Sequence, residues 1–102
     1  MSVSGQGLTI ERVDYDDLHL VMLRGELDLL SAPQLRSCLE DAMNSTVVVD
    51  LSGLSFIDAA GLSVLVTARR RAETDGNHVK VTNPAGLVRR VFELAGLDEL
   101  IE

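Results

Sequence analysis

Cysteine, aromatic residues and proline are all scarce in this sequence. Cys38 is the only cysteine, so the chain can form neither an internal disulfide nor a cysteine-based metal site, which fits a reducing, cytoplasmic setting. Aromatic residues make up 3% of the chain, so Leu, Val and Ile must build the core. With two prolines and 46% hydrophobic residues, the composition is that of an ordinary globular chain.

Positive charge is scarce as well. Nine basic residues stand against sixteen acidic ones, and the formal net charge of −7 repels nucleic-acid phosphates and anionic lipids. The short arginine clusters at residues 69–71 and 89–90 lie within helical patterns and indicate a solvated helix face. We therefore expect neither a nucleic-acid partner nor a membrane partner.

Long hydrophobic runs are absent too. No apolar stretch approaches the ~20 residues that a membrane-spanning helix needs. The first residues, MSVSGQG, lack the charged and apolar regions of a signal peptide. We expect a soluble, unprocessed, cytoplasmic protein.

What the chain does contain is the pattern of one small α/β domain, since 102 residues can bury a single core. Apolar residues at strand or helix spacing predict the order β-β-α-β-α-β-α, with a turn at residues 15–17. This order predicts a mixed four-stranded sheet with helices packed on it. The predicted domain covers residues 8–102, and residues 1–7 are expected to be a flexible leader. The strands are expected at residues 8–13, 18–25, 46–51 and 78–81, and the helices at about residues 32–43, 59–73 and 84–95.

Polar residues mark where each predicted helix begins. Ser31 with Gln34 has the form of a capping box, and Pro33 suits the first turn. Asp58 and Asn83 are the predicted N-caps of the other two helices. At the other ends, Asn44 and Ser45 are expected to close the first helix, and Gly76 and Gly96 the later ones. The apolar stripe of the first helix comprises Leu35, Cys38, Leu39, Ala42 and Met43.

The stretch FIDAAGL, residues 56–62, joins a strand pattern to a helix pattern. Ala59 and Gly61 leave the start of this helix almost without side chains, so another chain could approach closely. The residues alone favour a simple capped helix start and a docking site equally. One face of the predicted helix carries Ala59, Ser63, Thr67 and Arg70, and its core face carries Gly61, Val64, Leu65, Ala68 and Ala72.

Catalytic and metal-binding interpretations find little support in the sequence. Asp50 and Asp58 near strand ends could form a receiver-like phosphoacceptor, but such a site needs further carboxylates for Mg²⁺ and a nearby lysine. The only lysine, Lys80, lies within a strand pattern. His19 and His78 also lie in strand patterns, away from other metal ligands. We expect no enzymatic activity, no cofactor and no metal.

Three segments together resemble a known family. GELDLLSAPQL, VVVDLSGLSFIDAAGLSVLV and VTNPAGLVRRVFELAGLDELI, within residues 8–101, are similar to the anti-sigma factor antagonists, which are bacterial stand-alone STAS domains. The resemblance implies a protein that binds an anti-sigma factor, usually a serine kinase with a GHKL-type ATP fold. This binding frees a sigma factor and so controls transcription by partner switching.

In this family the kinase phosphorylates a serine at the start of the helix, and a phosphatase reverses the modification. The family pattern is Asp-Ser-Ser/Thr-Gly; here Asp58 and Gly61 match, but Ala59 occupies the acceptor position and cannot be phosphorylated. Ser63, one helical turn away, is the best alternative phosphosite, ahead of Ser52 and Ser55 in the preceding loop.

The resemblance also implies which residues contact the partner. Glu26, Asp28 and Ser31 match a second contact region of the family. We expect a monomer or weak dimer; the alternative is a STAS subunit of another regulatory, stressosome-like or lipid-transport assembly. The expected partner-binding residues are Glu26, Asp28, Ser31, Phe56, Asp58, Ala59, Ala60, Gly61, Leu62, Ser63 and Thr67.

Overall fold

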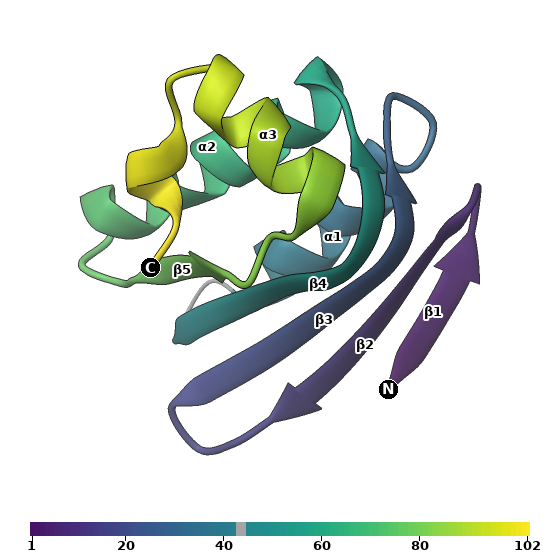
Figure 1. Cartoon of the computed structure of the whole chain (residues 1–102). Helices are drawn as coiled ribbons and strands as arrows, with labels where there is room; N and C mark the ends of the chain where they lie inside the picture. The colour runs from purple at the N-terminus through teal and green to yellow at the C-terminus, as the bar shows by residue number, and fades with distance from the viewer. Residues whose placement is uncertain (43–44) are drawn as a thin grey trace.

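The computed structural model describes residues 1–42 and 45–102. The chain folds into one five-stranded sheet whose helices gather on one side of it (Figure 1). In chain order the elements are β1 (Ser2–Gly5), β2 (Leu8–Asp14), β3 (Leu18–Leu27), α1 (Ala32–Asp41), β4 (Thr46–Ile57), α2 (Ala59–Thr74), β5 (Val79–Thr82), α3 (Gly86–Leu94) and the short 3₁₀ helix η1 (Asp98–Leu100).

The sheet is mixed, as the sequence predicts, and its strands lie in chain order. β1, β2 and β3 pair antiparallel, whereas β4 and β5 continue the sheet in parallel. The predicted number of four strands is wrong. Residues 1–7, expected to be a leader outside the domain, contain the fifth strand β1, which pairs with β2 from Ser2 opposite Glu11 to Gly5 opposite Leu8.

The core lies between the sheet and the helices. Along β2, β3, β5 and the first half of β4 the side chains alternate, so that one face of the sheet is buried beneath the helices. Leu8 and Ile10 of β2 and Val21 and Leu23 of β3 are each 2% exposed or less. On the helix side, the largest fully buried side chains are Leu35, Leu39, Leu65 and Phe92. Among the described helices, none is long and apolar enough to cross a membrane.

Two of the predicted helix starts need correction. Ser31 precedes α1 and Pro33 lies in its first turn, but Gln34 donates its side-chain N–H to the Leu8 carbonyl instead of completing a capping box. α3 begins only at Gly86, after Ala85, because Asn83 adopts a left-handed backbone with φ of 59°. The expectations for Met43 and Asn44 lie outside the described residues.

β4 is longer than predicted and extends through residue 57. Asp50 therefore lies within a strand instead of closing it, and Ser52 and Ser55 belong to β4 and not to a loop. Its pairing with β3 shifts register twice, and the two strands curve together (Figure 1). Gly25 lies in this irregular region with φ of 101°, a backbone conformation that favours glycine. A Cβ added there would also collide with the Gly7 carbonyl oxygen, so the position requires glycine. As a result, β3 and β4 end side by side, with Leu27 opposite Ile57.

Candidate partner-binding surface

The candidate surface forms where β3 and β4 end. β3 leads into a four-residue loop, residues 28–31, which we call the β3–α1 loop, and β4 leads through Asp58 into α2. Because these strands are parallel neighbours, the loop and the start of α2 lie next to each other. The two segments that the sequence predicts to contact a partner are thus brought together.

Asp58 joins the two segments. Its Oδ1 accepts a hydrogen bond from the Gly61 N–H at 3.0 Å, which confirms the predicted N-cap of α2. Its Oδ2 accepts a second bond from the Leu29 N–H at 3.1 Å, in the β3–α1 loop. The Asp58 N–H in turn donates to the Leu27 carbonyl at 3.2 Å. One side chain therefore begins the helix and fixes the loop against it.

Asp28 and Ser31 shape the β3–α1 loop from within. The Asp28 Oδ1 accepts hydrogen bonds from the Leu30 and Ser31 N–H groups, both at 3.1 Å. The Ser31 hydroxyl donates to the Glu26 carbonyl at 3.0 Å and accepts from the Asp28 N–H at 2.9 Å. Ser31 is fully buried, so its side chain positions the loop and does not belong to the exposed surface.

The loop presents two exposed leucines at the start of α2. Leu29 is 71% exposed and Leu30 is 67% exposed, and Phe56 at the end of β4 is 38% exposed. The sequence-based prediction included Phe56 but missed both leucines. Two consecutive leucines inside a four-residue turn were the signal, because a turn this short cannot bury both.

Gly61 has a different role from the one expected. It is buried, and a Cβ added there would lie 2.7 Å from Leu27 Cγ and 2.9 Å from the Leu27 carbonyl oxygen. The missing side chain therefore allows α2 to pack against the end of β3, instead of leaving room for a partner. Leu62 is also buried, at 8% exposure, and Ala60 is half-buried.

The two faces of α2 agree with the prediction. Ala59, Ser63, Thr67 and Arg70 are exposed, while the five residues assigned to the core face are all buried. We use the term docking surface for the exposed members of both segments: Glu26, Leu29, Leu30, Phe56, Ala59, Ser63 and Thr67.

The residues considered for catalysis or metal binding lie outside this surface and make other contacts in the fold. The Asp50 Oδ1 accepts a hydrogen bond from the Ser52 N–H at 2.8 Å. The His19 Nδ1 lies 2.6 Å from Asp14 Oδ1, and the His78 Nε2 lies 3.6 Å from Glu102 Oε2. Cys38 packs against the core, and burial raises the pKa of its thiol. Within residues 1–42 and 45–102, no group of three or more His, Cys, Asp or Glu side chains could hold a metal ion.

Comparisons with known proteins identify relatives across most of the chain. The family model described as "Mlab, STAS domain" matches residues 12–102. The anti-sigma-B factor antagonist of Staphylococcus epidermidis is 27% identical over 97 residues, which cover 92% of this chain and 90% of that protein. The anti-sigma F factor antagonist of Lysinibacillus sphaericus is 30% identical over 82 residues, which cover 76% of this chain and 70% of that protein.

The fold is similar to a solved member of the same group. The crystal structure of an anti-sigma factor antagonist from Mycobacterium paratuberculosis superposes with a TM-score of 0.80 at 26% identity, covering 97% of this chain and 87% of the other. This likeness and the sequence matches confirm the expected STAS-type α/β fold, with five strands in place of four. The chain belongs to the STAS domain family and, within it, to the anti-sigma factor antagonists.

Proposed function

We propose that this protein binds an anti-sigma factor of the GHKL serine-kinase type through the docking surface and thereby releases a sigma factor. The observation that carries the proposal is the double hydrogen bond of Asp58, which holds Leu29 beside the first turn of α2. The two exposed leucines beside this fixed helix start form an apolar patch that is already in place before a partner binds. Membership of the antagonist family supports the same partner class.

Ala59 bears on how the protein is regulated. It is exposed as the first residue of α2, beside the carboxylate of Asp58. A phosphoserine there would add a charge of about −1.5 to −2 within the docking surface and would oppose binding by repulsion and desolvation. Alanine lacks the hydroxyl that carries phosphate. We therefore propose an antagonist that stays competent to bind and is controlled by its synthesis, by a ligand or by competition.

Phosphorylation at another serine is the alternative mode of control. Ser63 is exposed on α2, one turn after Ala59. Ser55 is a weaker candidate because its hydroxyl donates a hydrogen bond to the Gly25 carbonyl at 3.1 Å. Ser63 therefore remains the better alternative site.

A STAS subunit of another regulatory or transport assembly is the second candidate function. The matching family model is described as "Mlab, STAS domain" and does not name an antagonist, so this match is compatible with the second candidate. A receiver-like phosphoacceptor is a weaker candidate, because both carboxylate oxygens of Asp58 already accept backbone hydrogen bonds.

The test is a calorimetric titration of purified GHKL-type anti-sigma factors from the bacterium that encodes this chain. Wild type and Ala59→Ser are expected to bind one of them with equal affinity, and Ala59→Asp to bind much more weakly because it places a second carboxylate beside Asp58. Equal binding by Ala59→Asp would contradict the proposed surface. Failure of wild type to bind any of them would contradict the proposed function and favour the other assembly.

A further inference from the structure

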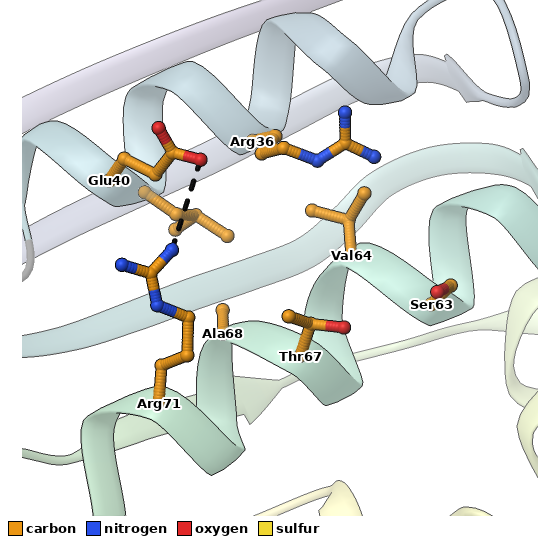
Figure 2. Close-up of a pocket in the computed structure, with 8 residues that line it drawn as sticks. Arg36, Glu40, Ser63, Val64, Thr67, Ala68 and Arg71 are labelled. Atoms are coloured by element: carbon orange, nitrogen blue, oxygen red, sulfur yellow. Dashed lines mark ion pairs between the residues drawn. The ribbon is translucent and has the colours of Figure 1, made fainter. Parts of the chain in front are cut away.

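A groove between α1 and α2 continues the docking surface. Ser63 and Thr67, which belong to the docking surface, line its α2 side, and Arg36 and Glu40 line its α1 side (Figure 2). Its floor is apolar and consists of Leu39, Val64 and Ala68. Arg71 reaches across from α2 toward Glu40.

The groove is positively charged in a strongly acidic chain. It contains Arg36, Arg71 and Glu40, so its net charge is positive, while the whole chain carries −7. Arg36 is exposed and makes no ion pair within the described parts of the chain. The Arg71 Nη1 lies 3.9 Å from Glu40 Oε1, and both side chains are more than half exposed, so this pair contributes little to stability.

We propose that this groove receives an acidic side chain of the anti-sigma factor, a glutamate or aspartate, and so helps to select the partner. The inference rests on the proposed function, because it names a chemical feature of that same partner. The apolar floor accommodates the aliphatic part of the side chain, and the guanidinium of Arg36 and the hydroxyls of Ser63 and Thr67 are donors for its carboxylate.

The two arginines contribute differently. Arg36 is free of ion pairs within the described residues, so its attraction to a partner carboxylate is not offset by loss of an existing contact. Arg71 lies 3.9 Å from Glu40, whose negative charge offsets part of the attraction between Arg71 and an incoming carboxylate. Glu40 also repels the incoming acidic group. Arg36 therefore supplies most of the attraction, and Glu40 opposes it.

Because Arg36 attracts the acidic side chain and Glu40 repels it, replacing them should change the binding affinity in opposite directions. Binding of the anti-sigma factor to Arg36→Gln is expected to be about tenfold weaker than to wild type, with a reduced dependence on salt. Arg71→Gln should have a smaller effect, and Glu40→Gln should bind more tightly than wild type. Arg89→Gln, an exposed arginine on α3, is the matched control and should bind like wild type. Thermal unfolding of each variant checks that the fold is retained.

The outcomes separate this inference from the proposed function. If Arg36→Gln and Glu40→Gln bind like Arg89→Gln while Ala59→Asp loses binding, the groove proposal is wrong and the docking surface stands. If wild type binds none of the anti-sigma factors, the proposed function and the groove proposal fail together. If Arg36→Gln weakens binding, an acidic-to-neutral substitution scan of the partner should find one residue whose loss has no further effect in that variant.

Discussion

The Asp58 carboxylate lies between the backbone N–H groups of Leu29 and Gly61, accepting a hydrogen bond from each at 3.1 and 3.0 Å. An N-cap aspartate ordinarily satisfies only the first turn of its own helix. Here the second oxygen is bonded to a loop 29 residues away in the sequence. The same side chain is thus expected to matter both for folding and for the shape of the docking surface.

Replacing Asp58 tests this double role. Asp58→Ala removes both acceptors, and we expect the free energy of unfolding to fall by about 0.5–2 kcal/mol, the usual range for losing an N-cap. Binding of the anti-sigma factor should weaken as well, because the β3–α1 loop loses its attachment. Urea unfolding and calorimetry measure the two effects. Asp75→Asn at the other end of α2 is the control, since an acidic residue there opposes the helix dipole and its loss should not destabilise.

The leucines of the β3–α1 loop should matter for binding and not for stability. We expect the double variant Leu29→Ser, Leu30→Ser to unfold like wild type, because both side chains are largely exposed. Its binding should weaken by about 2 kcal/mol or more, the loss that marks the few dominant residues of an interface. Leu94→Ser on α3, where Leu94 is 73% exposed, is the matched control. If the double variant binds no more weakly than Leu94→Ser, the β3–α1 loop lies outside the interface.

Position 59 should decide whether the kinase can modify the protein. With the cognate kinase and ATP, we expect wild type to stay unlabelled and Ala59→Ser to incorporate phosphate. Ala59→Ser combined with Ser63→Ala should be labelled equally well, which places the phosphate at residue 59. Phosphate on Ser63 of wild type, detected by mass spectrometry, would overturn the proposal of a permanently competent antagonist.

The ion pairs of β2 predict a pH dependence of stability. The Arg12 Nε lies 2.7 Å from Asp14 Oδ1, and the Arg12 side chain is only 8% exposed. The hydrogen bond from Arg12 is the main reason that the pKa of Asp14 lies below its usual value of 3.8, and the hydrogen bond with His19 is the second. A lowered folded-state pKa means that the charged carboxylate stabilises the fold above pH 3.8 and that this stabilisation is lost as the pH falls through the folded-state pKa.

Asp14→Asn should therefore be less stable than wild type at neutral pH, and the difference should vanish in acid. Urea unfolding across a pH series measures it. Asp16→Asn, in the exposed turn between β2 and β3, is the control and should follow wild type at every pH. A difference that stays constant down to low pH would mean that Asp14 acts through packing and not through its charge.

The periodicity of apolar residues was enough to predict most of the fold. The core positions of β2, β3 and α2 follow from it, because burial imposes a period of two or 3.6 residues. It could not predict β1, whose residues are all exposed and which forms by backbone pairing at the sheet edge. The start of α3 was misplaced by a different signal, the capping pattern of Asn83: this residue has a left-handed backbone, and the helix begins two residues later than predicted, at Gly86.

The candidate site was predictable where it depends on local sequence. The Asp58 cap follows from its position directly before a helix pattern, and the exposed face of α2 follows from helical spacing. The bond between Asp58 and Leu29 depends on the paired ends of β3 and β4, which lie far apart in the sequence. Helical spacing predicted that Gly61 is buried, but its close contact with Leu27 depends on the same strand pairing and was missed for the same reason.

Because of the bond between Asp58 and Leu29, the docking surface exists only in the completely folded protein. Neither the β3–α1 loop nor the first turn of α2 contains the surface alone, and β3 and β4 must already be aligned before the two can meet. A nascent chain released before β4, or a proteolytic fragment ending there, would carry the leucines without their neighbours. A partner that recognises this surface would thus respond to the concentration of intact, folded protein and ignore incomplete copies.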